Sequence, residues 1–146
     1  MLAKLKNVLI LIFLCSSVGC QTGGYFATEE AYVPVDDFAD RLAKDIIVSV
    51  QSNFPPAKTR LYFPHGKEKL ALLLEERFRK YGYGIVSDQK SRQPGDIQIG
   101  YKLDSIENSI IMLRVVVGEH FQVNRIYQKD KDGSFIVSGP TLLRKG

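Results

Sequence analysis

The sequence has few of the residues from which many active sites and cross-links are made. Its 146 residues include no tryptophan, two histidines and two cysteines. Both cysteines, Cys15 and Cys20, lie in the first 20 residues. If Cys20 is consumed by acylation, as argued below, no thiol remains for a disulfide, a zinc site or nucleophilic catalysis. The folded domain must then be held together by packing alone.

Motifs for catalysis and metal binding are also missing from the sequence. His65 and His120 lie in predicted turns, and neither has a second ligand at helical or hairpin spacing, so both are expected to be surface or turn residues. The chain contains no GxSxG, HExxH or Walker-type run. The alternating glycines of 81–84 (YGYG) are better explained by a helix end followed by a strand. We therefore expect no enzyme, and neither a cofactor nor a metal.

The net charge is too small to indicate nucleic-acid binding. The 20 Lys and Arg residues outnumber the 16 Asp and Glu residues by 4. Two of these cations, Lys4 and Lys6, belong to the predicted leader, so the remaining chain has 18 basic and 16 acidic residues, a formal charge of +2. We expect no direct contact with nucleic acid.

The first 19 residues have the composition of a secretory signal. Lys4 and Lys6 precede the unbroken apolar run of 8–14, and small residues follow it. The apolar segment is about half the roughly 20 residues that a membrane-spanning helix requires. Residues 1–19 are thus predicted to be a removable signal peptide.

Cys20 is the predicted site of lipidation. Residues 17–20 (SVGC) resemble the lipobox of bacterial lipoproteins, in which the cysteine at the cleavage point carries diacylglycerol. Cys15 cannot be the lipidated cysteine, because the residue before it, Leu14, is too bulky for a lipobox. Cys15 is therefore expected to leave with the signal peptide. Fatty acyl chains such as palmitate would hold Cys20 at a membrane. Gln21 after the cysteine, where inner-membrane lipoproteins of Gram-negative cells have Asp, indicates the periplasmic face of the outer membrane.

Residues 20–35 connect the predicted anchor to the predicted domain. The segment has paired glycines, a proline and no regular period, as a tether does. It also contains Tyr25, Phe26, Tyr32 and Val33, so an arm that docks on a partner is the alternative.

Two amphipathic helices are predicted in the domain. The first begins at Asp36 or Asp37, which can cap it, and ends before Pro55 and Pro56. The second spans 67–81 and ends at Gly82. Their apolar residues recur at spacings of three and four, namely Phe38, Leu42, Ile46 and Val50 in the first and Leu70, Leu73, Leu74 and Phe78 in the second. Surface ion pairs are expected for Asp37–Arg41, Asp40–Lys44, Glu75–Arg79 and Glu76–Lys80.

The remaining segments predict strands. Residues 58–63 and 83–87 form short strands on either side of the second helix, and 88–96 form a loop. Residues 97–103, 110–117, 121–127 and 134–138 follow as strands joined by turns. The predicted fold is α+β, with two helices packed on one face of a largely antiparallel sheet that ends in a β-meander. The domain spans 36–140 and a tail spans 141–146.

Two surfaces are candidates for binding partners. The stretch Ser134–Val137 is the best candidate for an exposed sheet edge, which can accept a strand from a neighbour. Lys58 and Arg60, with Lys67 and Lys69, form a basic stripe that either meets an acidic partner or is simply solvated; we favour the second interpretation.

The chain resembles a known family. The lipobox, residues 40–43 (DRLA), 81–90 (YGYGIVSDQK) and 142–146 (LLRKG) are similar to the conjugal transfer lipoprotein TrbH of plasmid mating systems. The resemblance implies an outer-membrane lipoprotein that acts as a structural and assembly subunit of a conjugative type IV secretion apparatus. It also implies protein partners among the other core subunits, in a multi-subunit ring. The alternative is a stand-alone periplasmic lipoprotein that binds peptidoglycan or a small ligand.

Overall fold

The computed structural model describes residues 29–30 and 38–146. The predicted signal peptide, Cys15, Cys20, most of the tether, and Asp36 and Asp37 lie outside the described residues. Two short segments interrupt the regular order as 3-10 turns, Pro56–Lys58 and Gln89–Ser91. The helices and strands are, in chain order, β1 (Glu29–Glu30), α2 (Ala39–Gln51), β2 (Arg60–Tyr62), α3 (Lys69–Lys80), β3 (Gly84–Val86), β4 (Ile97–Glu107), β5 (Ile110–Val117), β6 (Phe121–Lys129), β7 (Phe135–Val137) and β8 (Leu142–Lys145).

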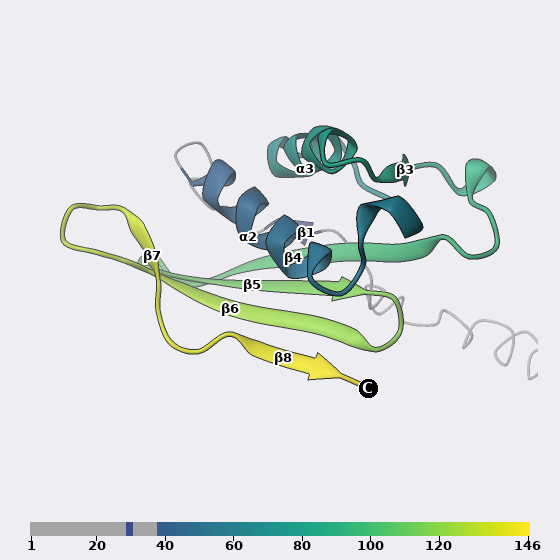
Figure 1. Cartoon of the computed structure of the whole chain (residues 1–146). Coiled ribbons are helices and arrows are strands. Elements are labelled where there is room, and N and C mark those ends of the chain that lie inside the picture. Colours follow the sequence, from purple (N-terminus) through teal and green to yellow (C-terminus); the bar gives the residue numbers. More distant parts are fainter. Residues whose placement is uncertain (1–28, 31–37) are drawn as a thin grey trace, which may run out of the picture.

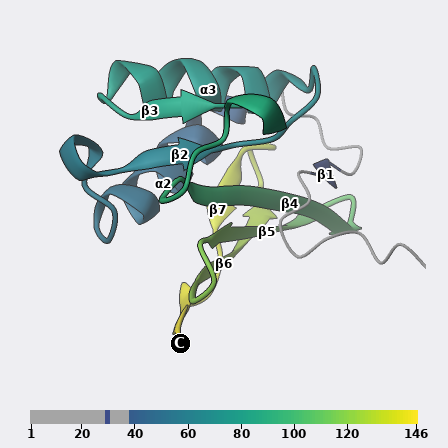
Figure 2. The same cartoon turned by 90° about the vertical axis from the view of Figure 1, so that its right-hand side faces the viewer.

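The strands form one mixed sheet in the order β3-β2-β4-β5-β6-β7, with β1 beside β4 and β8 beside β6. The strands β4, β5 and β6 make the expected antiparallel meander, whereas β2 is parallel to both β3 and β4. Both helices lie on the same side of the meander (Figure 1). Seen from the side, α3, β2 and β3 form the upper part of the molecule and the meander forms the lower part (Figure 2). The predicted α+β class is confirmed.

Helix α2 buries the face that its fourfold spacing predicts. Leu42, Ile46 and Val50 are fully buried against the sheet. The helix begins at Ala39, later than predicted, and its N-cap residue is Phe38, which makes no side-chain cap. The expected pair between Asp40 and Lys44 is wrong, because the Asp40 carboxylate pairs with Arg77 of α3. Contact with a neighbouring helix thus replaces the local pair.

Helix α3 ends in a Schellman motif, as the position of Gly82 predicted. The Gly82 amide donates to Arg79 O at 3.0 Å and the Tyr83 amide donates to Phe78 O at 3.0 Å. Gly82 has φ +90°, a conformation that favours glycine. The rings of Phe78 and Tyr83 pack edge to face, with centroids 5.3 Å apart. Burial raises the pKa of the Tyr83 phenol to about 12.

The meander divides its side chains between two faces as expected. Ile99, Tyr101 and Leu103 of β4 and Phe121, Val123 and Tyr127 of β6 are buried under the helices. The opposite face carries residues such as Met112 opposite Ile126, which are only partly buried or exposed. The helices therefore cover one face of the sheet, and the apolar core lies between them and that face.

The segment predicted as a C-terminal tail forms a strand. Leu142–Lys145 pairs antiparallel with β6, with Leu142 opposite Asn124 and Lys145 opposite Phe121. The shorter strand β7 pairs with the other end of β6, opposite Tyr127 to Lys129. Both β7 and β8 thus lie along the same side of β6, and both are edge strands.

Candidate interaction surface

The predicted lipidation site, Cys20, lies outside the described residues and stays a prediction. In the described part of the chain, neither helix has the length and apolar character needed to cross a membrane.

His65 is not the surface residue that its turn position suggested. Its side chain is only 4% exposed, and its ring lies 4.6 Å from that of Phe63. Its Nε2 lies 2.9 Å from Glu75 Oε2, and its Nδ1 lies 2.8 Å from the carbonyl oxygen of Gly66. Both ring nitrogens therefore face hydrogen-bond acceptors. These two contacts hold the turn before α3 against the helix, so the role of His65 is structural.

Glu75 connects this turn to the end of α3. Its Oε1 accepts from Arg79 Nη2 at 2.6 Å, which confirms the predicted i,i+4 pair. The hydrogen bond from Arg79 is the main cause that lowers the pKa of Glu75, and the bond from His65 adds to it. The second histidine, His120, is 71% exposed in the turn between β5 and β6, as predicted.

For residues 29–30 and 38–146, no group of three or more His, Cys, Asp or Glu side chains is arranged to hold a metal ion.

A partly buried polar cluster joins α2 to β6. Arg125 Nη1 lies 3.0 Å from Asp45 Oδ2, and the Tyr127 hydroxyl donates to the same oxygen at 2.7 Å. Arg125 Nε also donates to Thr141 Oγ1 at 3.2 Å, just before β8. Burial opposes the charge of Arg125, but the hydrogen bond and the negative charge of Asp45 outweigh it and raise the guanidinium pKa. Burial, with Asp45, raises the pKa of the Tyr127 phenol. Arg125 therefore remains charged and holds α2, β6 and the segment before β8 together.

The alternation of residues in β6 contains a signal for this cluster. Arg125 occupies the inward-facing position between Val123 and Tyr127, where the alternation of apolar residues predicts another apolar side chain. A charged residue at such a position requires a partner of opposite charge. Which residue supplies it could not be read from the sequence, because Asp45 is 80 positions away.

The basic stripe predicted along β2 is partly occupied by the chain itself. Arg60 bonds to the side chain of Gln93, donates to Ser91 O at 3.1 Å and lies 3.5 Å from Asp96. The guanidinium of Arg92 lies over the Tyr62 ring, 4.6 Å from its centroid, and helps to bury Tyr62 beside Arg60 on β2. These contacts favour a structural role for Arg60 over partner binding.

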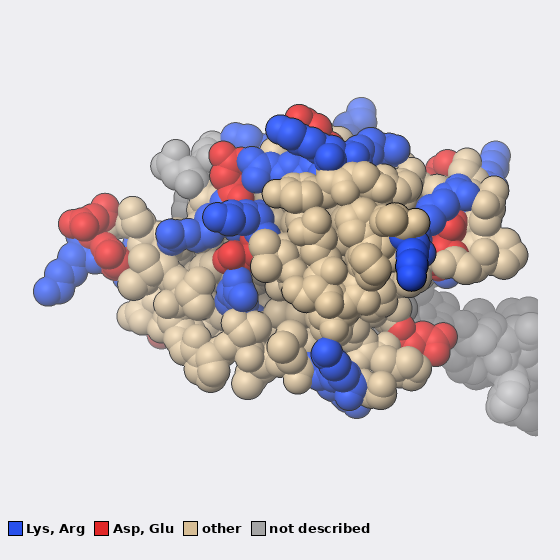
Figure 3. All heavy atoms as spheres, viewed as in Figure 1, with Lys and Arg blue, Asp and Glu red and all other residues tan. Residues whose placement is uncertain are grey.

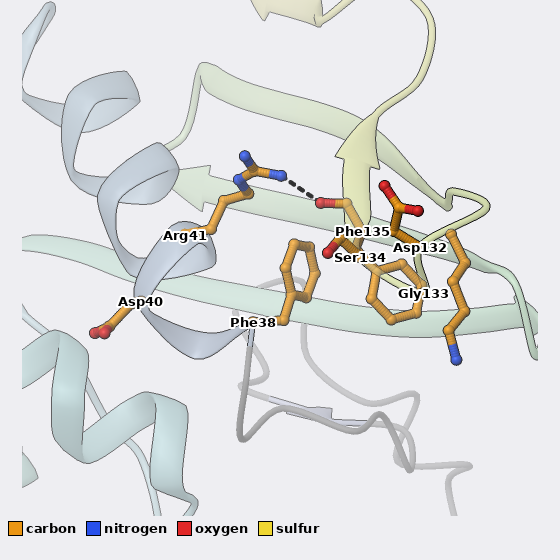
Figure 4. Close-up of a pocket in the computed structure, with 8 residues that line it drawn as sticks. Phe38, Asp40, Arg41, Asp132, Gly133, Ser134 and Phe135 are labelled. Atoms are coloured by element: carbon orange, nitrogen blue, oxygen red, sulfur yellow. Dashed lines mark hydrogen bonds between the residues drawn. The ribbon is translucent and has the colours of Figure 1, made fainter.

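A pocket lies between the start of α2 and the hairpin that joins β6 to β7. Phe38, Arg41, Lys129, Asp132 and Phe135 are among its lining residues. Figure 4 shows Arg41 reaching across to the carbonyl of Phe135 and Asp40 pointing away toward α3. The lining mixes aromatic rings with charges of both signs, and no set of side chains converges to bind one ligand group.

Two edge strands of the sheet are protected by arginine side chains. Arg41 of α2 donates to the carbonyl of Phe135 on β7. Arg79 of α3 donates to the carbonyl of Ile85 on β3 at 3.2 Å. Each bond occupies an edge carbonyl that would otherwise accept from another strand. The edge predicted at Ser134–Val137 is therefore present, but the carbonyl of Phe135 already accepts a hydrogen bond from Arg41.

Strand β8 has no such protection among the described residues. Leu142 and Leu143 are 60% and 58% exposed, and Arg144 and Lys145 are exposed as well. In Figure 3 the Lys and Arg side chains gather over α3, while the lower margin, where Figure 1 places β8, is mostly uncharged apart from a basic group. An exposed edge with apolar side chains is the feature of this domain best suited to binding a protein.

Comparison with known proteins assigns the chain to a family. The model of the family described as conjugal transfer protein TrbH matches residues 21–146. Neither the curated proteins nor the solved structures give a match. The family match extends over the helices, the meander and β8, and it includes every residue from Gln21 to Gly146. The chain therefore belongs to the TrbH family of conjugal transfer proteins.

Proposed function

We propose that the protein is an outer-membrane lipoprotein that acts as a structural and assembly subunit of a conjugative type IV secretion apparatus. The lipid on Cys20 would hold the domain at the periplasmic face of the membrane. The domain would contribute binding surfaces to the other core subunits, in a multi-subunit ring. The role in conjugal transfer itself follows from the family.

The signal-like leader and the lipobox support the anchor. At about 0.8 kcal/mol per buried methylene, two or three acyl chains bind a membrane stably. Substituting Cys20→Ser should therefore move the protein from the membrane fraction to the soluble periplasmic fraction. Mass spectrometry of the wild-type protein should find a fatty-acylated cysteine as the first residue. Unchanged fractionation of the variant would contradict the anchor.

The exposed edge of β8 is the observation that most supports an assembly role. Its two exposed leucines lie beside an edge that no described residue covers. Edge strands commonly bind partners by adding a strand to the sheet. An enzyme would instead require a reactive pair in a pocket, and neither histidine of the chain is placed for such a role.

Gel filtration of detergent extracts from mating cells tests the assembly role. The wild-type protein should elute in a large complex together with other secretion subunits. Elution near the size of a monomer would instead favour a stand-alone lipoprotein that binds peptidoglycan or a small ligand. Deleting the other transfer proteins provides the control, because it should release the chain from the large species.

A further inference from the structure

The pairing of β8 with β6 determines which backbone groups of β8 face outward. The Gly146 amide donates to His120 O at 2.9 Å, so this pair is hydrogen-bonded. Hydrogen-bonded and non-hydrogen-bonded pairs alternate along an antiparallel ladder. The register places Arg144 opposite Gln122 and Leu143 opposite Val123. The amides and carbonyls of Leu143 and Lys145 therefore point away from β6, toward the open edge.

The same reasoning applied to β7 shows how an edge is closed in this fold. The Asp130 amide donates to Ser134 O at 2.8 Å, so Phe135 is the next residue whose backbone points outward. Its carbonyl accepts from Arg41. On β3, the Ile85 carbonyl accepts from Arg79 in the same way. No described side chain donates to the outward groups of β8, so within the described residues β8 is an open edge of the sheet.

The side chains of β8 specify the chemistry of a matching strand. Leu142 and Leu143 are apolar and more than half exposed. Arg144 and Lys145 form no ion pair within the described residues. Residues directly opposite each other on paired strands interact, and opposite charges there are favourable. An antiparallel partner would thus place two acidic residues opposite Lys145 and Arg144, followed by two apolar residues opposite Leu143 and Leu142.

The β8 strand of a second copy of the chain has two basic residues and no acidic ones, so it does not match β8 in this way. An antiparallel pairing that sets Leu143 of one copy opposite Lys145 of the other would place Arg144 opposite Arg144. Like charges directly opposite each other destabilise a strand pair. Residues 38–146 as a whole carry 18 Lys and Arg against 12 Asp and Glu, which also disfavours association of two such domains.

From this geometry we infer that β8 is a docking strand for an extended segment of another protein that has two acidic residues followed by two apolar ones. The segment pairs antiparallel with Leu142–Lys145 and extends the sheet beyond β8. The inference rests on the proposed function, since it names the partner chemistry of the assembly subunit. It requires no change in the domain, because the outward groups are already in strand geometry.

Amide exchange on the full-length protein in detergent tests this inference. The probes are a short synthetic peptide whose centre reads Glu-Glu-Val-Val and a matched peptide that reads Lys-Lys-Val-Val. The acidic peptide, at millimolar concentration, should slow exchange of the Leu143 and Lys145 amides by about tenfold or more. The lysine peptide should leave both amides unchanged.

Two variants distinguish edge pairing from other binding. Leu143→Pro removes an outward amide but no bond to β6, and it should abolish protection at Lys145. The matched variant Val137→Pro, at an outward position of β7, should leave that protection intact. The double charge reversal R144E and K145E should make the lysine peptide the one that protects.

Equal protection by both peptides, or no protection at β8, would overturn the inference. Neither result depends on the size of the complex in mating cells. A large complex without peptide protection would leave the proposed function standing and remove only the docking strand. Elution as a monomer together with peptide protection would remove the proposed assembly role and leave the docking strand standing.

Discussion

Arg125 Nη1 on β6 lies 3.0 Å from Asp45 Oδ2 on α2, and the same oxygen accepts from the Tyr127 hydroxyl. Each of the two charged side chains is about four-fifths buried. A pair this buried is sensitive to the loss of either partner, because the remaining charge would be left without compensation.

Replacing Arg125 with Met should destabilise the domain. The Asp45 carboxylate would keep only the Tyr127 hydroxyl as a partner. We expect a loss of about 1–3 kcal/mol in the free energy of unfolding. The loss should be smaller than for a fully buried pair, because both groups are partly solvated. Urea unfolding followed by circular dichroism measures it. The control is Arg114→Met, since Arg114 is exposed on β5 and its loss should change stability by less than about 0.5 kcal/mol.

Leu74→Ala and Leu72→Ala make a matched pair on α3. Leu74 is fully buried, whereas Leu72 is 49% exposed. The first substitution should cost about 2–5 kcal/mol, because it leaves a cavity in the core. The second should change the free energy of unfolding by less than about 1 kcal/mol. Similar losses at both positions would mean that α3 does not pack as described.

Gly82→Ala should destabilise the end of α3. An alanine at φ +90° is strained, and we expect a loss of about 1–3 kcal/mol in unfolding free energy. Gly82→Asn should lose less, because asparagine tolerates this region better. Thermal unfolding should rank the wild type as most stable, Gly82→Asn next and Gly82→Ala last. If alanine were tolerated as well as asparagine, the Schellman motif would not limit stability here.

Acid should weaken the domain partly through Glu75. Its pKa in the folded protein is lowered from an ordinary value of 4.5, chiefly by Arg79, so the folded state favours the carboxylate. This contribution is present above the unfolded pKa and is lost as the pH falls through the lower folded pKa.

Glu75→Gln should therefore remove part of the loss in stability below about pH 4.5. The unfolding free energies of wild type and variant, measured from pH 7 to pH 3, should converge toward the acidic end. A constant difference across this range would exclude the linkage. Glu76→Gln is the control, because Glu76 is exposed on the same helix.

Much of the fold was predictable because local patterns set it. The spacing of Leu70, Leu74 and Phe78 identified α3, and Gly82 identified its end. The alternation in β4 and β6 identified the meander and its buried face. The start of α2 was placed too early, because Asp36 and Asp37 resemble caps whereas the helix begins at Ala39.

The sequence by itself determined most of the elements, the confinement of both cysteines to the first 20 residues, and the family resemblance that the comparison confirmed. Those follow from residue type and from periods of two or 3.6 residues. Only the tertiary structure decided that Arg125 meets Asp45, that Arg41 and Arg79 each occupy one carbonyl of an edge strand, and that Leu142–Lys145 forms an open edge. These relationships join residues far apart in sequence, and a short strand such as β8 takes its conformation from the strand beside it rather than from its own pattern.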